Sequence, residues 1–170
     1  MNTIQRRERI LEYLRGADRP LSATALAQRL SVSRQIIVGD VALLRAAGEG
    51  ITATPRGYVL DRPQAGQRYT VACLHSGGDM ERELTLMVDQ GCTVEDVIVE
   101  HPVYGQLTGP LELSSRYDVL EFMRKVGENA ARPLSDLTGG IHLHTLRCPD
   151  REAFERVTAA LDGAGFLLKG

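Results

Sequence analysis

Apolar positions in the N-terminal third of the chain recur at spacings of three and four residues, which is the pattern of short amphipathic helices. The pattern predicts helices from Thr3 to Leu14, after Ser22, and from Arg34 to about Ala47. Ser22 and Ser33 precede the second and third stripes and are suitable N-caps, and Gly48 is suited to end the third helix. The expected core-facing residues are Ile10, Leu11, Leu14, Ala23, Leu26, Ala27, Leu30, Ile37, Val41 and Leu44. The short turn before Ser33 is typical of a helix-turn-helix.

After Gly48 the spacing of the apolar residues changes from that of helices to that of strands. Residues 51–54 and 58–60 read as two short strands, and Pro55-Arg56-Gly57 between them reads as a turn. The order of helix, helix-turn-helix and hairpin is that of a winged helix. Residues 26–35 and 57–60 resemble the winged helix-turn-helix of many bacterial repressors and of biotin ligase repressors.

The rest of the chain alternates between strand and helix periods. The predicted strands are Arg68 to Leu74, Val94 to Glu100, Gln106 to Leu113 and a segment around residues 141–146, with a closing edge strand at Phe166 to Leu168. The predicted helices follow caps at Asp79, Ser115 and Asp150. This pattern predicts an α+β domain with two or three helices on one face of a mixed β-sheet.

The net charge also changes sign between the predicted winged helix and the α+β domain. Residues 1–62 hold ten Arg against six Asp and Glu, a net charge of +4, and residues 63–170 carry −6. A basic half joined to an acidic half suggests two domains, and the basic one is suited to bind a polyanion. We expect a DNA-binding domain at residues 1–62 and a second domain at 68–170, joined by a short polar linker.

The chain has no apolar run near the roughly 20 residues of a transmembrane helix, and its N-terminus lacks the apolar core of a signal peptide. We therefore expect a cytoplasmic protein without membrane contacts. Cys73, Cys92 and Cys148 are far apart and form no Cys-x-x-Cys pair. They are expected to be buried free thiols, with thiolate ligation as the alternative.

The third helix would enter the major groove with its N-terminal turn leading. Arg34 can offer two donors to a guanine edge, Gln35 can pair with adenine, and Ser33 at the helix start suits a phosphate. Arg56 at the hairpin tip is placed for a phosphate or the minor groove. The predicted DNA-binding residues are Ser22, Ser33, Arg34, Gln35, Val38 and Arg56. The alternative is a protein-docking module with a solvated Arg face.

Two further residues of the third helix bear on this surface. Gly39 costs about 1 kcal/mol of helix stability relative to Ala. Either close approach of the backbone to DNA or a packing constraint would explain it. Asp40 would repel phosphates if it faced them, so we expect it to point sideways.

The second domain contains a His-x-His pair. His142 and His144 share one face of a strand, and neutral imidazole is a common metal ligand. By themselves they could equally lie on an exposed strand face. Glu83 falls inside the apolar stripe of its helix, where a carboxylate must be paired, hydrogen-bonded or bound to metal. An ordinary ion pair is the alternative.

Longer motifs extend this pattern. From about residue 69 to 146 the chain looks like the 3H domain, which is named for its histidines. The residues that carry this resemblance are His75, Glu81 to Leu84, Val88 to Gly91, Asp96 to Gly105 and Pro133 to Thr145. With the winged helix in front, nearly the whole chain resembles the niacin-responsive transcriptional repressors, which control genes for nicotinate salvage and NAD synthesis.

This resemblance implies a metal held by His75, Glu83, His142 and His144. Such a donor set suits nickel or zinc, and copper would also bind it, whereas calcium and magnesium would require more oxygen ligands. The remaining histidine, His101, could line an effector pocket together with Tyr104 or could pack the turn that they share.

The resemblance further implies a homodimeric repressor that binds operator DNA with nicotinic acid, or nicotinamide, as co-repressor. Dimerisation is expected because helix-turn-helix proteins read two half-sites. The alternative is a regulator for which nickel or zinc is itself the signal. A metalloenzyme fused to a DNA-binding domain is a third possibility, but no separate general base stands at a persuasive spacing, so we expect no enzymatic activity.

Overall fold

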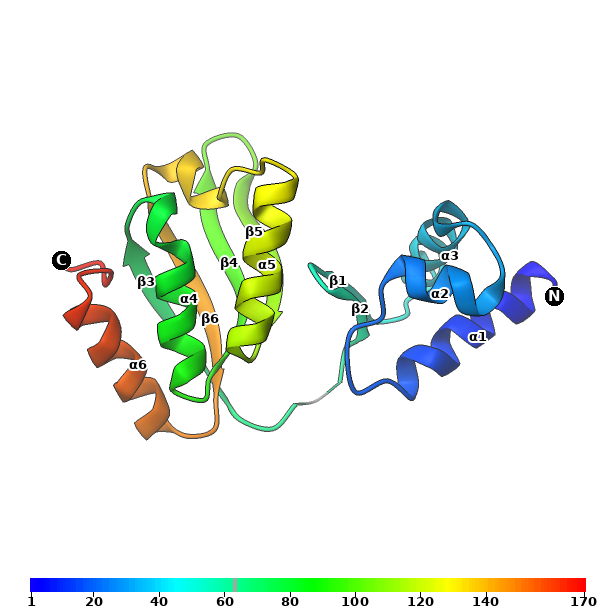
Figure 1. The fold of residues 1–170 in the computed structure, drawn as a ribbon, viewed down its shortest axis with the longest axis horizontal. Coiled ribbons are helices and arrows are strands. Elements are labelled where there is room, and N and C mark those ends of the chain that lie inside the picture. The colour runs from blue at the N-terminus through cyan, green and yellow to red at the C-terminus, as the bar shows by residue number, and fades with distance from the viewer. Residues whose placement is uncertain (63) are drawn as a thin grey trace. The chain divides into compact units, whose positions relative to one another are not determined.

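The computed structural model describes residues 1–62 and 64–170 of the chain. It divides into two compact units, residues 1–63 and 64–170. Each unit is described separately, beginning with the N-terminal one (Figure 1).

The first unit has the predicted order of three helices followed by a hairpin. The helices are α1 (Thr3–Arg15), α2 (Ala23–Leu30) and α3 (Arg34–Ala46), and β1 (Ile51–Thr54) pairs antiparallel with β2 (Gly57–Leu60). Both caps predicted for this unit are confirmed, since the hydroxyls of Ser22 and Ser33 accept hydrogen bonds from the N–H groups of Ala25 and Ile36. A winged helix-turn-helix therefore forms, as expected.

The hairpin is attached to the helices at Gly57. Leu21 and Tyr58 exchange backbone hydrogen bonds, which fixes the hairpin beside the start of α2. Gly57 has a φ of +138°, and a Cβ there would lie 2.4 Å from the carbonyl carbon of Leu21. Glycine is required because any side chain would separate the hairpin from this segment.

Asp40 lies on the inner side of α3 and is 4% exposed. Its carboxylate oxygens lie 2.5 Å from Nε of Arg6 and 3.2 Å from Nε of Arg7, both on α1. A buried charge of this kind requires such partners. The residue therefore ties α3 to α1, in agreement with the expectation that it would not face a phosphate backbone.

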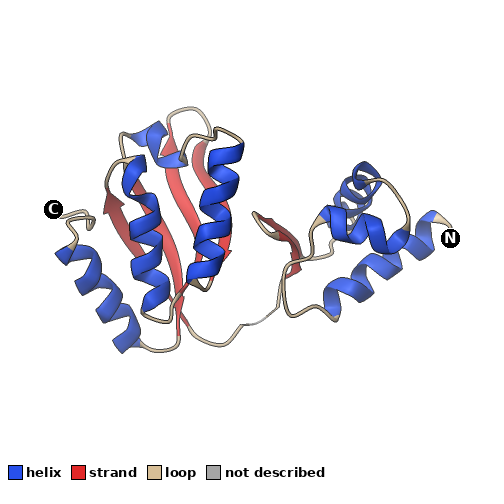
Figure 2. Ribbon diagram, viewed as in Figure 1, coloured by secondary structure: helices blue, strands red, loops and turns tan. Residues whose placement is uncertain are grey.

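The second unit is an α+β domain, and the predicted fold class is confirmed. Its strands are β3 (Gln67–Leu74), β4 (Thr93–His101), β5 (Gly105–Leu113) and β6 (Ile141–Cys148). Its helices are α4 (Met80–Asp89), α5 (Arg116–Glu128) and α6 (Arg151–Gly163), with short 3-10 turns at Gly77–Asp79 and Leu134–Thr138. Of the caps predicted for this second unit, Ser115 and Asp150 are confirmed, whereas Asp79 is wrong because its side chain makes no capping hydrogen bond. The three α-helices lie on one face of the sheet (Figure 2).

The sheet is antiparallel, so the expected mixed sheet is wrong in this detail. The strand order is β3-β6-β4-β5, and each neighbouring pair in it is antiparallel. The last strand in the sequence, β6, lies between β3 and β4. The expected edge strand at Phe166 to Leu168 is reduced to one bridge between Leu167 and Cys73.

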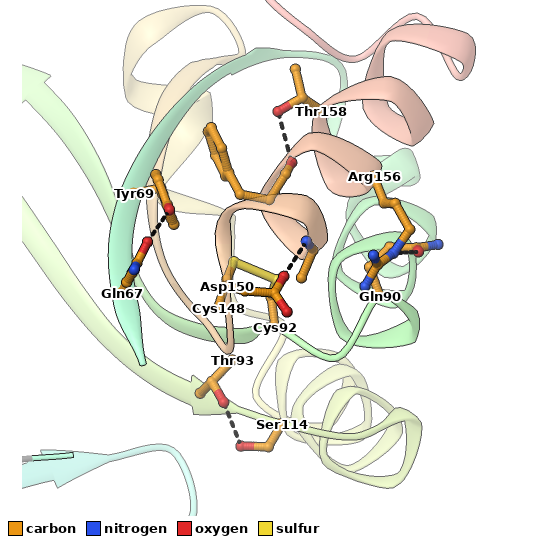
Figure 3. Close-up of a disulfide and its surroundings, with 12 residues drawn as sticks. Gln67, Tyr69, Gln90, Cys92, Thr93, Ser114, Cys148, Asp150, Arg156 and Thr158 are labelled. Atoms are coloured by element: carbon orange, nitrogen blue, oxygen red, sulfur yellow. Dashed lines mark hydrogen bonds between the residues drawn. A yellow bond between two sulfur atoms is a disulfide. The ribbon is translucent and has the colours of Figure 1, made fainter. Parts of the chain in front are cut away.

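A disulfide joins Cys92 and Cys148, and the expectation of free thiols is wrong for this pair (Figure 3). Thr93 of β4 pairs with Arg147 of β6, which places the adjacent cysteines next to each other. The two cysteines are 56 residues apart in sequence, so no local motif reveals the pairing. Cys73 is buried and free, as expected.

Within the described residues, no helix is both long enough and apolar enough to cross a membrane.

Candidate metal centre and DNA-binding surface

The four residues predicted as metal ligands come together where β3 and β6 pair beneath α4. The strand register sets Cys73 opposite His142 and Val71 opposite His144. His142 and His144 alternate with outward-facing residues of β6 and are 3% and 2% exposed. The pair therefore lies inside the domain and not on an exposed strand face.

Glu83 of α4 lies at the centre of this cluster and is 1% exposed. Its Oε1 is 2.9 Å from Nε2 of His142, and its Oε2 is 3.4 Å from Nε2 of His144 and 2.7 Å from Nε2 of His75. The structure thus brings together all four residues of the predicted ligand set from a strand end, a helix and a second strand.

The three imidazoles share one hydrogen-bonding pattern. Each has its Nδ1 within hydrogen-bonding distance of a backbone carbonyl: His75 of Ser76 at 2.7 Å, His142 of Gly140 at 2.8 Å, and His144 of Asp96 at 2.7 Å. A neutral ring that donates through Nδ1 carries its lone pair on Nε2. All three lone pairs are then directed at Glu83. Outer partners of this kind commonly orient metal-ligating histidines.

The charges in the cluster are strongly coupled. Burial acts to raise the pKa of Glu83, but its close contacts with His142, His144 and His75 outweigh it and hold that pKa well below its usual value. Burial acts to lower the pKa of His75, but the contact with Glu83 outweighs it and raises the pKa. Glu83 is therefore ionised, and this buried negative charge would be stabilised by a positive charge beside it.

These residues fit a divalent metal ion. Three imidazole lone pairs and a carboxylate are all acceptors, so a cation between them would relieve their mutual repulsion. Nε2 of His75 is buried and makes no hydrogen bond of acceptable geometry with any described residue, despite its short distance to Glu83. Nitrogen and oxygen donors in this proportion suit zinc, nickel or copper.

A pocket of about 620 Å³ opens beside His75. Its lining includes Leu74, His75, Ser76, Gly77, Asp136 and Gly140. Gly140 has a φ of +96°, and a Cβ there would lie 2.6 Å from the carbonyl oxygen of His75. Gly140 therefore allows β6 to start directly against the histidine that borders the pocket.

The predicted effector residues lie elsewhere in the same unit. His101 ends β4, and its Nδ1 accepts hydrogen bonds from the backbone N–H groups of Val103 and Tyr104. The rings of His101 and Tyr104 are 5.1 Å apart, and Tyr104 is 76% exposed. The pair packs its own turn, and neither residue is among those that line the pocket beside His75.

Three of the predicted DNA-binding residues lie at the start of α3. Ser33, Arg34 and Gln35 are exposed there. Val38 is half-buried and packs against the core of the unit, and Ser22 is half-buried with its hydroxyl capping α2. Arg56 follows β1 at the tip of the hairpin, where its N–H bonds to the hydroxyl of Thr54. Arg34 and Gln35 are therefore accessible at the start of α3, and base reading by them stays a prediction.

The chain has clear similarity to known proteins. A family model described as the 3H domain matches residues 68–170, and one described as an HTH domain matches residues 6–59. The probable transcription repressor NiaR of Thermotoga maritima is 43% identical over 165 residues, which cover 97% of this chain and 94% of that protein. The transcription repressor NadR of Bacillus subtilis is 43% identical over 168 residues, which cover 96% and 93%. This chain belongs to the NiaR and NadR family of transcription repressors.

Membership of this repressor family confirms the resemblance inferred from the sequence motifs. It also agrees with the expectation that the protein is a DNA-binding regulator and not an enzyme. In this NiaR and NadR family member, the helix-turn-helix match spans α1 to the hairpin, and the 3H match spans the second unit.

Gly39 illustrates how the surface of α3 can be tested. Apart from its chain neighbours and the nearby backbone of α3, no described atom lies within 4 Å of an ideal Cβ at this position, so packing within the unit does not require glycine. We expect Gly39→Ala to stabilise the helix by about 1 kcal/mol, because alanine has the higher helix propensity. The same substitution should weaken DNA binding, because the added methyl group would hinder close approach of the backbone.

Thermal unfolding and DNA affinity, measured on the same sample, check the expected gain in stability and the expected loss of DNA affinity. Gly163→Ala, in α6 of the second unit with no described atom within 4 Å of its Cβ, is the matched control for helix propensity. If Gly39→Ala binds DNA as tightly as the parent protein, close approach does not explain the glycine.

Proposed function

We propose that this repressor controls genes of niacin salvage and NAD synthesis, with nicotinic acid as co-repressor and a divalent metal in the second unit. The observation that carries the proposal is the convergence of three imidazole Nε2 atoms on Glu83 beside an open pocket. His75 belongs to both the cluster and the pocket lining. A small anion in the pocket would therefore lie next to the metal ligands.

Nicotinate has two groups that suit this position. Its carboxylate or its pyridine nitrogen could take an open coordination position on nickel or zinc. When bound, the metal would supply an electrophilic anchor for the effector. His75, Glu83, His142 and His144 would hold the metal, and the backbone carbonyls at Nδ1 would keep the rings in orientation.

Co-repression requires that nicotinate bind the DNA-competent state more tightly than the other state. A coupling free energy of about 1–3 kcal/mol is typical and corresponds to about 5- to 150-fold. We therefore expect nicotinate to tighten operator binding by a factor in this range.

Mobility shifts at fixed salt test the proposal with operator fragments obtained by in vitro selection. Metal-loaded protein should shift DNA more strongly with nicotinate, and chelator-treated protein should lose the response. Nicotinamide, which lacks the carboxylate, separates recognition of the acid from recognition of the ring. Absence of an effect from either compound on the metal-loaded protein would overturn the effector assignment.

The second candidate is a metal sensor in which nickel or zinc is itself the signal. The full burial of Glu83, His142 and His144 favours it, because a metal there would act on the packing of the domain. In that case the metal alone would titrate operator binding, and nicotinate would add nothing.

A homodimer is part of the proposal, because paired half-sites require two recognition helices. The sheet face away from the helices offers apolar side chains for self-association, with Leu74 at 42%, Ile141 at 46% and Leu143 at 36% exposure. Sedimentation of the full chain should give twice the mass of one copy.

A further inference from the structure

Cys73 lies among the four residues that are proposed to bind the metal. It is the last residue but one of β3, His75 follows the end of that strand, and the backbone of Cys73 pairs with that of His142 on β6. The side chain is 0% exposed. One ligand atom each from Cys73, Glu83 and His142 lie within 4.8 Å of one another.

We propose that Cys73 is a fifth ligand of this site and binds the metal ion as a thiolate. The inference rests on the metal proposed above, but it assigns a donor beyond the His75, Glu83, His142 and His144 set. When the sulfur–metal bond forms, the proton of the thiol leaves to solvent.

The charge of the cluster supports this assignment. Three neutral imidazoles and one carboxylate around a divalent cation leave a net charge of +1 in a buried region, and uncompensated charge is costly there. A thiolate from Cys73 brings the net charge of the cluster to zero. The buried Nε2 of His75 has no hydrogen bond with the described residues, so its lone pair is available to a cation in this cluster.

The other sulfur atoms do not compete for this role. Cys92 and Cys148 form the disulfide at the far end of β6, so Cys73 is the free thiol among the described residues. A thiolate is a soft donor and favours zinc, cobalt or cuprous copper over manganese or magnesium. Cys73 would therefore determine which metal the site retains.

Cobalt(II) substitution of the full-length, demetallated protein tests the assignment. Thiolate ligation produces an intense near-ultraviolet sulfur-to-cobalt charge-transfer band, which histidine and carboxylate ligation lack, and cobalt binding in either case gives weaker visible bands. We expect the charge-transfer band in the parent protein and its loss in Cys73→Ser, while the visible bands persist.

A double variant, Cys92→Ala with Cys148→Ala, is the control and should keep the charge-transfer band. Because Cys73→Ser could fail to fold, cadmium-113 NMR of the unsubstituted protein gives a second readout, in which a sulfur ligand shifts the resonance strongly downfield. Visible bands without a charge-transfer band in the parent protein would overturn the role of Cys73 and leave the four-residue metal site intact. Failure to bind cobalt at all would overturn both the fifth ligand and the metal of the proposed function.

Discussion

Glu83→Gln is expected to abolish tight metal binding while leaving the second unit folded. Glu83 contacts Nε2 of all three clustered histidines and is their shared anionic partner. Loss of an outer-shell partner commonly costs about 10- to 100-fold in metal affinity, so loss of this central carboxylate should cost more than roughly 100-fold. The introduced amide retains the volume of the side chain and can donate hydrogen bonds to the Nε2 lone pairs. The fold should therefore survive.

Metal competition against a chromophoric chelator measures this loss, and circular dichroism monitors the fold. Glu81→Gln is the matched control, because Glu81 lies on the same helix and is exposed. The substituted protein should also lose any response of operator binding to nicotinate. Retention of full metal affinity in Glu83→Gln would contradict the assignment of Glu83 as a ligand.

Arg34→Ala is expected to weaken operator binding by about 1–3 kcal/mol, which corresponds to about 5- to 150-fold. Arg34 is the first residue of α3 and is exposed, so its guanidinium can reach a guanine edge when the helix enters the major groove. Loss of a bidentate contact should also relax sequence preference at one base pair of the half-site. Affinities at one fixed salt concentration, measured on operators that vary at each position, check both effects.

Arg45→Ala is the control for the removal of one positive charge, because Arg45 is exposed in the last turn of the same helix. A base contact and a phosphate contact differ in their signatures. Loss of a phosphate contact weakens binding about equally on all sequences and lowers the salt slope by about 1. If Arg34→Ala weakened binding equally on all operator sequences, Arg34 would contact the phosphate backbone and would not read a base.

Local signals in the sequence determined most of the elements and much of the cluster. The caps at Ser22 and Ser33 were predictable because a side-chain oxygen that accepts from the N–H three residues later acts within one turn. Glu83 was predictable as a buried carboxylate because helical periodicity places it on the core face. The His-x-His pair was recognisable because residues two apart share a strand face.

The tertiary structure decided everything that depends on which strands pair. The sheet is antiparallel because β6 inserts between β3 and β4, and this pairing also creates the disulfide and sets Cys73 opposite His142. It also brings Gly140 against the carbonyl of His75. Periodicity reports which face of an element is buried, but it carries no information on the partner across that face. The four predicted ligands could be named from the sequence once its family resemblance supplied the set, whereas their convergence and the thiol beside them required the long-range register of the strands.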